Sequence, residues 1–577
     1  MKKKLPKIWF IVFFLVLIVL AAFFCNRYAK KTELTNQQIN KSTVSTIIVP
    51  HHDLVKDKRA EFFKSIKSKS NSKTIVLAST NHFQTGSCNI ETTDQDWNLA
   101  DGKISANKTV ITKLIDEKIA CNENSAFERE HGIKNILADI ETTFPKADIV
   151  PLMIKSNTKT ADLDSLISIL QKENDDFIFI ASVDFSHYQP ANLAQLHDDF
   201  TISALDNLDT EKIQKAETDS PEVLYSALSW AKLEKTEKFN LFANTNSGFL
   251  SNNFDVESTT HVMGSYGKGD PPAGGSKADD SFTFTFGGDM MFDRGIEYFF
   301  QGDKLMDVMK NLGERTFWGT DIEMVNLEGP ISSIPREPDY NHSLVFNFPP
   351  KTIDVLKWMH LNAVSLANNH SLNNGQNGLS YTVELLKKND IAPIGQDARV
   401  DADSIKEFSG NGIKASVITI DTLNTDLDIN LIKAEKKKGN KVIIYPHWGN
   451  EYEQTHSQAQ ENLAESWIDA GADLIVGSHP HVVQDIDIYK NVPIVYSLGN
   501  LLFDQYFSPE TQEGLIVAGK FTTDKLELIV LPTIQKDTKP QLQTGTAKQK
   551  TLNTVLKNIK QNEKIKIEYD RIVIMGN

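Results

Sequence analysis

The sequence predicts an α/β protein of two successive domains, preceded by one N-terminal transmembrane helix. Short apolar runs alternate with helical patterns in both halves of the chain, which indicates buried parallel strands joined by helices. A segment rich in Gly, Pro and Ser separates the two series. An apolar run follows a cluster of lysines at the start of the chain. These three observations define the predicted organisation.

Length, charge and cysteine content narrow the class of protein. A chain of 577 residues is too long for one hydrophobic core, so at least two domains are expected. The net charge of -15 argues against nucleic acid as a partner, because phosphate binding requires a basic surface. The cysteines Cys25, Cys88 and Cys121 exclude a disulfide framework and a zinc ribbon, and at most Cys88 and Cys121 could pair. Metal ligands must therefore be His, Asp, Glu or Asn.

The N-terminal segment has the pattern of an uncleaved membrane anchor. The predicted parts are a basic cytoplasmic segment at residues 1–7, a transmembrane helix at residues 8–25 and a polar tether at residues 26–43. Phe23 and Phe24 stand where a signal peptidase needs small residues, so a cleaved signal peptide and a lipoprotein site at Cys25 are weaker alternatives. The predicted localisation is the cell membrane, crossed once, with the bulk of the chain extracytoplasmic.

The first half of the chain, residues 44–266, is predicted to form one α/β domain. Its apolar runs have the length of buried strands and lie at residues 47–49, 74–78 and 177–183. A helical pattern covers residues 161–172. Gly, Pro and Ser then become so dense that no core can form, and we assign residues 267–280 to an interdomain linker.

The second half, residues 281–507, repeats the α/β pattern, and residues 508–577 are predicted to add a β-rich extension. Apolar runs predict strands at residues 282–286, 322–326, 363–366, 415–420, 441–445, 473–476 and 493–496. Helical patterns between these runs lie at residues 353–360, 379–388 and 457–470. The extension has two more strand-like runs, a Lys-rich helix and a last strand, which we expect at the edge of the domain.

Residues of types that can bind metals (Asp, Glu, Asn or His) follow five of these predicted strands. In open α/β sheets, ligands bind beyond the carboxyl ends of the strands. The residues found at these strand ends are Asp289, Glu328, Asn369, His370, His447, His479 and His481. Carboxylate, imidazole and amide oxygen suit Mn, Fe or Zn, and a pair of such ions can activate water at neutral pH. The sequence therefore predicts a site for two divalent metal ions in a hydrolase-type domain.

Six short motifs in this half occur in the order of a known family. They are Gly288-Asp289, Asn326-Leu327-Glu328-Gly329-Pro330, Ala367-Asn368-Asn369-His370-Ser371, His447-Trp448-Gly449-Asn450-Glu451-Tyr452, Gly477-Ser478-His479-Pro480-His481-Val482 and Tyr496-Ser497-Leu498-Gly499-Asn500. With these motifs, residues 281–507 strongly resemble the CapA family of poly-γ-glutamate capsule biosynthesis proteins. That family is a branch of the calcineurin-like metallophosphoesterases, so the resemblance implies a metallophosphoesterase α/β sandwich.

The resemblance also implies roles for the side chains in these motifs. The implied metal ligands are Asp289 and His481 for one ion, Asn369, His447 and His479 for the other, with Glu328 bridging the two. His370 would be the general acid, and Arg294 and Glu451 would bind substrate. Phosphoesterases of the wider superfamily carry a His two residues after the first Asp, where this chain has Met291. The first metal therefore lacks one expected ligand, which Asp293 or water would have to replace.

A second set of histidines lies in the first half of the chain. The motifs are Val49-Pro50-His51-His52, Ser79-Thr80-Asn81-His82, Glu130-His131-Gly132-Ile133 and Val183-Asp184-Phe185-Ser186-His187-Tyr188. They resemble the MEMO-like family, which includes AmmeMemoRadiSam system protein B and whose fold is related to class III extradiol dioxygenases. The resemblance implies a second metal site, for iron or another divalent metal, at His51, His82 and His187. His131 and Asp184 would be accessory groups.

Two departures from the MEMO-like pattern leave the role of this half open. The family's Pro-His-Ala-Gly-Tyr is Pro-His-His-Asp-Leu here, and its later metal-binding Cys, expected near residues 244–248, is missing from the sequence. The pocket either binds a metal or is retained only as a binding surface. A third alternative is an oxygenase.

The leading functional hypothesis is a membrane-anchored, metal-dependent hydrolase or transferase of the CapA type. It would act in the biosynthesis of poly-γ-glutamate capsule or another cell-envelope polymer, with the MEMO-like domain as an accessory. The expected partners are the cell membrane and the poly-γ-glutamate synthesis machinery. The alternatives are a non-catalytic envelope scaffold and a general phosphoesterase unrelated to capsule.

Overall fold

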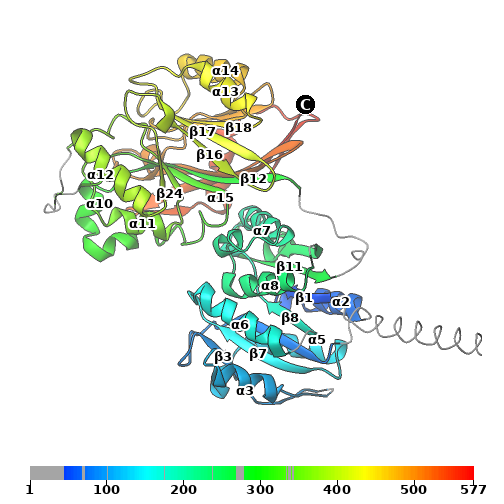
Figure 1. The fold of residues 1–577 in the computed structure, drawn as a ribbon. Coiled ribbons are helices and arrows are strands. Elements are labelled where there is room, and N and C mark those ends of the chain that lie inside the picture. Colours follow the sequence, from blue (N-terminus) through cyan, green and yellow to red (C-terminus); the bar gives the residue numbers. More distant parts are fainter. Residues whose placement is uncertain are drawn as a thin grey trace, which may run out of the picture.

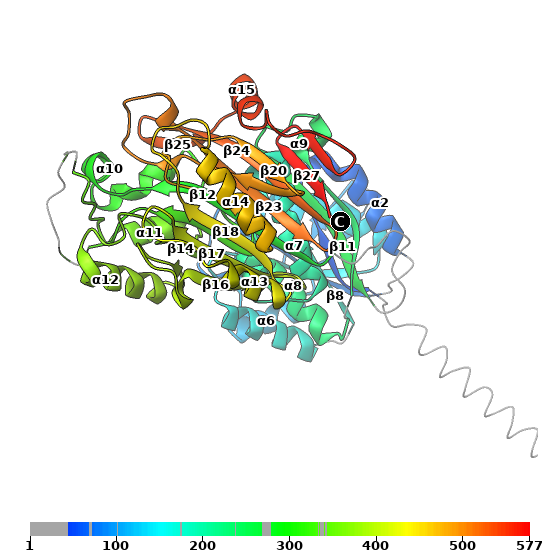
Figure 2. The same ribbon diagram turned by 90° about the horizontal axis from the view of Figure 1, so that it is seen from above.

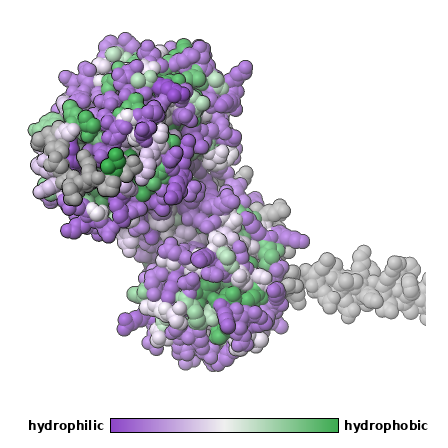
Figure 3. Space-filling model, turned by 60° about the vertical axis from the view of Figure 1, so that its left-hand side comes forward, coloured by the Kyte–Doolittle hydropathy of each residue, from purple (hydrophilic) through white to green (hydrophobic). Residues whose placement is uncertain are grey.

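The computed structural model describes residues 44–576 apart from 68–71, 101, 174–175, 237, 268–278, 333, 335–339 and 341–342. Two α/β bodies follow one another along the chain, and α7 of the first body faces the second (Figures 1 and 2). The face of the molecule in Figure 3 is mostly hydrophilic in both bodies, with small separate apolar areas.

The first body is built on one nine-stranded sheet with the order β10-β11-β1-β8-β2-β7-β3-β6, and β9 pairs with β11. The strands are β1 (Val44–Val49), β2 (Thr74–Thr80), β3 (Ile90–Thr92), β6 (Cys121–Asn122), β7 (Asp148–Ile154), β8 (Phe177–Ser182), β9 (His187–Gln189), β10 (Phe239–Asn246) and β11 (Ser258–Gly267). β1, β8, β2 and β7 are parallel neighbours. A small hairpin joins β4 (Trp97–Asn98) and β5 (Lys103–Ile104).

Helices cover both faces of this sheet because successive strand residues point to opposite sides. Ile47 and Val49 pack with α2 (Lys56–Ile66) and α5 (His131–Thr143) in one apolar core. Ile48 packs in the other core, against α3 (Lys108–Asp116), α6 (Thr160–Glu173), α7 (Ala191–Asp206) and α8 (Pro221–Leu233). The short helices α4 (Asn124–Phe127) and α9 (Ser247–Ser251) lie in connections. A disulfide joins Cys88 to Cys121.

The second body contains two sheets. The ten-stranded sheet has the order β15-β14-β13-β12-β23-β24-β27-β26, with β22 on β12 and β25 on β24. Its strands are β12 (Ser281–Met290), β13 (Ile322–Leu327), β14 (Ala363–Ser365), β15 (Ala392–Ile394), β22 (Asn500–Leu502), β23 (Glu513–Thr522), β24 (Lys525–Lys536), β25 (Lys539–Leu542), β26 (Ile565–Glu568) and β27 (Arg571–Met575). The six-stranded sheet comprises β16 (Ile405–Ser409), β17 (Lys414–Asp421), β18 (Lys441–His447), β19 (Leu474–Val476), β21 (Val492–Val495) and β20 (Ile486–Tyr489).

The two sheets pack face to face and helices cover their outer faces. Phe284 and Phe286 of β12 share the central core with Ile443 and Tyr445 of β18. The outer face of the larger sheet carries α10 (Arg294–Phe299), α11 (Thr352–Trp358) and α12 (Gly375–Lys388). The outer face of the smaller sheet carries α13 (Ile429–Lys437) and α14 (Gln458–Ala470), and α15 (Gly545–Val555) closes one end of the central core.

Local signals in the sequence set the ends of these helices. Ser457 and Gln460 form a reciprocal capping box at the start of α14. The helix ends at Gly471, whose φ of 118° is accessible to glycine without steric cost. The same helix buries Ala464 and Trp467 against the smaller sheet, so a periodic apolar face and two terminal signals agree.

The predicted fold class needs one correction. Residues 8–25, predicted as a transmembrane helix, lie outside the described residues. In the part of the chain that is described, no helix is both long and apolar enough to cross a membrane. The longest described helix, α7, has 16 residues, whereas about 20 apolar residues are needed for a span. The prediction of a single-pass membrane protein, with the membrane as a partner, is therefore not supported, and the fold is a mixed α/β fold with several sheets.

Buried charges and apolar side chains connect the two bodies. Leu193 and Leu196 of α7 belong to the core of the second body. Lys548 of α15 is 2.7 Å from Asp255 of the first body and 2.6 Å from Asp570 of the second. Because the side chains of Lys548 and Asp570 are almost fully buried, each depends on the other for charge compensation.

Replacing Lys548 tests whether this contact holds the two bodies together. Lys548→Ala leaves Asp570 buried without its counter-ion, and we expect the free energy of unfolding to fall by about 3–5 kcal/mol. Lys550→Ala, on an exposed position of the same helix, is the matched control and should change it by less than about 0.5 kcal/mol. Urea unfolding of the full chain measures both. Equal stability of the two variants would contradict the account.

Glu323 of β13 gives the fold a defined pH dependence. Burial raises the pKa of this carboxyl to about 8, although Thr320 donates to it. Between about pH 4.5 and 8 the unfolded chain loses a proton that the folded chain keeps, so stability falls as the pH rises through this window. Glu323→Gln should flatten that fall by up to roughly 1 kcal/mol per pH unit, measured by urea unfolding. The control Glu384→Gln, at an exposed position, should leave the fall of stability with pH unchanged.

Candidate metal centres

Strands from both sheets of the second body end at one place. β12 and β13 run parallel, with Asp289 opposite Asn326. β17, β18 and β19 run parallel in the other sheet, and a bridge between His447 and Ser478 continues their pairing into the next loop. The carboxyl ends of parallel strands share one edge of a sheet, so the residues that follow them are brought together there. A Cβ at Gly288 would lie 2.0 Å from the Gly499 carbonyl oxygen, so this close approach requires glycine.

Asp289, Glu328 and His481 form one part of this strand-end cluster. Nδ1 of His481 lies 3.5 Å from Asp289 Oδ2, and Nε2 lies 3.5 Å from Glu328 Oε1. Nδ1 is also 3.0 Å from Asn500 Oδ1, an acceptor that favours the proton on this nitrogen. Nε2 then presents its lone pair toward the Glu328 carboxylate. An imidazole held through its second nitrogen in this way is typical of a metal ligand.

Asn369, His447 and His479 form the other part of the cluster. Nε2 of His447 lies 3.0 Å from Asn369 Oδ1 and 3.1 Å from Nδ1 of His479. Nδ1 of His447 is 3.1 Å from the Ser478 hydroxyl, which leaves Nε2 facing its two neighbours. The His479 backbone N–H donates to Asp289 Oδ2 over 3.1 Å and thereby connects the two parts.

The loop that carries two of these histidines has an unusual backbone. His479 and His481 have φ values of 98° and 57°, in the left-handed region that favours glycine. Such conformations cost about 1–3 kcal/mol each and persist where the surrounding structure enforces them, often at functional sites. These two strained conformations bring the imidazoles of His479 and His481, which belong to one short loop, into the same cluster.

Burial controls the charge of the cluster. It raises the pKa of Asp289 to about 7 and that of Glu328 well above its usual value, because an ionised carboxylate would be removed from water. It lowers the pKa of His479 and His481 to about 4 and that of His447 well below its usual value. The imidazoles are therefore neutral at pH 7, the form that binds metals.

These donor groups fit divalent cations. Glu328 Oε1 is buried and has no hydrogen-bond partner among the described residues. The ligand atoms of Asp289, Glu328 and His447 lie within 4.8 Å of one another, and so do those of Glu451, His479 and His481. Neutral imidazoles, carboxylates and an amide oxygen around an unpaired buried oxygen form a donor set that Mn²⁺, Fe²⁺ or Zn²⁺ accepts.

The remaining predicted residues surround this cluster in different ways. Nε2 of His370 is 3.9 Å from Glu328 Oε1, and its ring lies against Phe346. Glu451, predicted to bind substrate, is exposed. Its carboxylate lies within 4.8 Å of ligand atoms of His479 and His481, so it could also bind the metal.

Arg294, and Met291 at the position where related phosphoesterases have a histidine, are both buried. The Arg294 guanidinium forms a buried ion pair with Asp504. Met291 is fully buried, and its sulfur accepts from the backbone N–H of Asp293. Both carboxylate oxygens of Asp293 accept backbone N–H groups, from Arg294 and Asn347. These bonds hold the Asp293 carboxylate against the backbone of residues 294 and 347.

Two amides were not singled out from the sequence. Asn326 Nδ2 donates to Asp289 Oδ1 over 2.8 Å and lies 3.3 Å from Glu328 Oε2, so it orients both carboxylates. Asn500 holds His481 as described above. Both residues lie inside the family motifs, so their presence there could have drawn attention to them. The rule that ligands lie beyond strand ends does not distinguish a residue that binds metal from one that orients a metal ligand.

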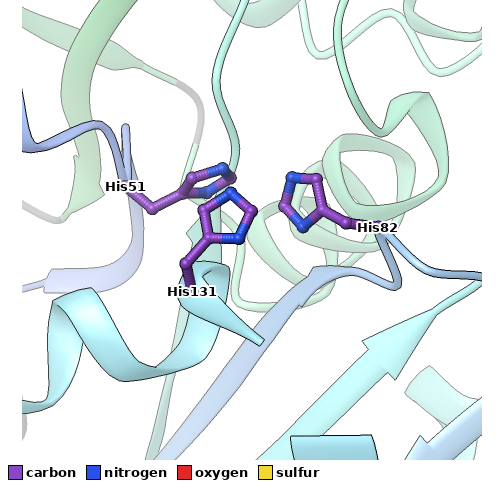
Figure 4. A group of neighbouring side chains, drawn as sticks. All are labelled: His51, His82 and His131. Carbon is purple, nitrogen blue, oxygen red and sulfur yellow. The ribbon is translucent and has the colours of Figure 1, made fainter. Parts of the chain in front are cut away.

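A second cluster lies in the first body, where His51 and His82 follow β1 and β2 and His131 begins α5. Figure 4 shows the three rings turned toward one another, with centroids 4.0 to 5.0 Å apart. Burial lowers the pKa of His51 to about 4. Burial also acts to lower the pKa of His82, but Asp219 and Glu130 outweigh it and raise that pKa to about 9.

Asp219 is the residue of this cluster that sequence reasoning missed. Its Oδ2 lies 3.4 Å from Nε2 of His51 and 3.6 Å from Nε2 of His82. Neither carboxylate oxygen accepts a hydrogen bond from the part of the chain that the structure describes. Asp219 precedes α8 and does not follow a strand, so the strand-end rule gave no signal for it. His51, His82 and Asp219 lie close enough to hold one divalent cation, which would have to displace the proton that His82 carries at pH 7.

The other predicted residues of the first body lie next to this cluster. Asp184 accepts from the His51 backbone N–H over 3.0 Å, and its Oδ2 lies 3.4 Å from His51 Nε2. His187 is outside the group of three; its backbone N–H donates to Glu217. Residues 244–248, where the family's Cys was expected, form the end of β10 and the start of α9.

The fold and these clusters define a two-body α/β protein with candidate metal centres at strand ends. Two family descriptions match it. "Bacterial capsule synthesis protein PGA_cap" matches residues 283–505, and "Memo-like protein" matches residues 20–262. The second range begins before the described residues.

Three relatives cover different parts of the chain. The PGA biosynthesis protein CapA of Bacillus subtilis (strain 168) is 30% identical over 307 residues, which are 50% of this chain and 80% of that protein. The capsule biosynthesis protein CapA of Bacillus anthracis is 28% identical, covering 42% of this chain and 64% of its own length. A MEMO1 family protein of Caldivirga maquilingensis is 28% identical, covering 30% and 64% respectively. The chain belongs to the bacterial capsule synthesis protein family and carries a Memo-like domain in its first half.

Asp289→Asn tests whether the buried carboxylates are kept for a cation. In protein treated with EDTA, this change removes the cost of burying a carboxylate, and we expect a gain in stability of roughly 1–3 kcal/mol at pH 8. The same variant should lose the stabilisation by the ion at Asp289, which is about 2.7 kcal/mol for one site at one hundred times Kd.

The matched control for this prediction is Asp485→Asn. Asp485 is equally buried but pairs with His456, so its loss should lower stability and leave the response to Mn²⁺ intact. Thermal melts with EDTA and with Mn²⁺ measure both variants. An Asp289→Asn variant that is destabilised and responds to Mn²⁺ as strongly as the wild type would contradict the assignment.

Proposed function

We propose that the second half is a divalent-metal-dependent hydrolase or transferase of the phosphoesterase type. It would act in the biosynthesis of poly-γ-glutamate capsule or another cell-envelope polymer. The observation that supports this most strongly is the buried strand-end cluster, in which Glu328 Oε1 has no hydrogen-bond partner among the described residues and faces neutral imidazoles. A site of this kind is unfavourable for stability and is explained by a bound cation.

The roles of the side chains follow from their positions. Asp289, Glu328 and His481 would hold one ion, and Asn369, His447 and His479 the other. Bound divalent ions supply Lewis acidity at a phosphoryl or carbonyl oxygen. His370 would be the general acid through Nε2, which faces the cluster while Nδ1 lies 3.0 Å from Asn373 Oδ1. Because burial lowers the pKa of His370, Nε2 would have to take up a proton before donating it to the leaving oxygen.

The link to an envelope polymer rests on the relatives. The Bacillus subtilis and Bacillus anthracis proteins are named for PGA and capsule biosynthesis, and the first of them matches over 80% of its length. We therefore propose the poly-γ-glutamate synthesis machinery as the partner of this protein. The Memo-like half would serve as a metal-binding accessory domain, supported by the grouping of His51, His82 and Asp219.

Hydrolysis assays on the full chain test this function. With Mn²⁺ present, the protein should cleave at least one substrate of a panel that contains a phosphodiester, a phosphomonoester and poly-γ-glutamate. His447→Ala should reduce both metal content and rate, the latter by about 100-fold or more. His370→Ala should keep the metal content and lower kcat by about 10² to 10⁴-fold.

His456→Gln is the control for these variants. His456 lies in the same half, outside the cluster, stacked on Tyr496, and its replacement should leave the rate unchanged once folding is verified by a thermal melt. If His370→Ala and His447→Ala match the wild type in every assay, the catalytic proposal fails and the cluster has a structural role.

A further inference from the structure

A cleft of about 860 Å³ lies between the two bodies. The first body contributes the loop after β7, the start of α6 and the start of α8, while the second contributes Glu314, Arg315, Trp318 and His360. Ligand sites occur preferentially at domain interfaces, and this volume lies within the usual range for a small-molecule site. The cleft is separate from the strand-end cluster of the second body, and none of the proposed catalytic residues lines it.

Positive groups at the cleft can receive a carboxylate. Lys159 is exposed and lies at the start of α6, a helix of 14 residues whose first backbone N–H groups have no partners within the helix. Arg315 comes from the second body, and Nη1 donates to Glu217 over 2.8 Å and to the Thr218 carbonyl over 3.2 Å. No other hydrogen bond of its guanidinium is found within the described ranges, so most of its five donors are available to a ligand.

Negative groups line the same cleft. They are Glu222 and the exposed Glu314, together with Asp219, whose carboxylate also faces His51 and His82 of the first-body cluster. Three carboxylates beside two cations disfavour a polyanion, because a polyanion requires a surplus of positive charge. The same lining is complementary to a ligand that carries one carboxylate and one ammonium group.

A flat aromatic wall completes the cleft. The rings of Trp318 and His360 are stacked, with centroids 3.8 Å apart and planes 14° from parallel. The Arg315 guanidinium lies 5.3 Å from the Trp318 ring. Burial lowers the pKa of His360 to about 4, and Arg315 adds to that effect, so the stack is uncharged at pH 7. An uncharged planar surface of this kind suits the flat amide groups of a peptide.

We propose that this interdomain cleft binds a free amino acid or short peptide, with the ligand's carboxylate at Lys159 and Arg315 and its ammonium group at Glu222 and Glu314. Trp318 and His360 contact the uncharged part of the ligand. The site exists only in the fused chain, because Arg315, Trp318 and His360 come from one half and Lys159 and Asp219 from the other. The ligand class follows from the charges of Lys159, Arg315, Glu222 and Glu314, none of which belongs to either candidate metal centre.

Titration calorimetry with trialanine tests the proposal on the full chain. Trialanine should bind, while N-acetyl-trialanine, which lacks the ammonium group, and trialanine amide, which lacks the carboxylate, should each bind about tenfold more weakly or worse. Binding should also change the fluorescence of the wild type but not that of Trp318→Phe, because this tryptophan is in the cleft.

Variants at exposed cleft positions complete the test without endangering the fold. Lys159→Gln and Glu314→Gln should each weaken trialanine binding about tenfold. Lys172→Gln, an exposed lysine at the far end of α6, is the matched control and should bind as the wild type does. The proposal is overturned by any of three results: no binding up to millimolar trialanine, equal binding of the blocked peptides, or wild-type binding by Lys159→Gln.

Discussion

The burial of Asp289 and Glu328 together, beside three neutral imidazoles, is the constraint on which the second half depends. Two carboxylates held away from water raise each other's cost of ionisation, and hydrogen bonds from Asn326 offset only part of it. A cation between these carboxylates and the imidazoles would remove the conflict. The folded chain therefore holds an arrangement that is unfavourable for the protein alone and favourable for a metal complex.

The architecture around the cluster follows from that constraint. Two sheets must end at the same place, which requires the parallel pairing of β12 with β13 and of β18 with β19. The loop after β19 must also adopt strained φ values to bring two histidines to one point. Outside the cluster, capping boxes and alternating apolar residues provide stability in the ordinary way, so the unfavourable features are concentrated at the candidate site.

The sequence indicated candidate site residues where an apolar strand pattern is followed directly by a side chain that can bind metal. Asp289, Glu328 and the histidines that follow predicted strands lie close together in the structure, since parallel strands bring their carboxyl ends together. Their assigned roles stay predictions. Asp219 could not be found in this way, because it reaches its cluster from the start of a helix through a long-range contact. The predicted membrane span rested on an apolar run, the lysines before it and the bulky residues at its end, and no described helix could cross a membrane.

The joining of a Memo-like half to a capsule synthesis half is also a physical arrangement. Lys548 and Asp570 are buried where the halves meet, and α7 places two leucines in the core of the second body. Anomalous X-ray diffraction from crystals soaked in Mn²⁺ tests the central claim most directly. The account predicts two Mn²⁺ peaks, one among Asp289, Glu328 and His481 and one among Asn369, His447 and His479. A cluster without any peak, in protein shown to be saturated with Mn²⁺ elsewhere, would contradict it.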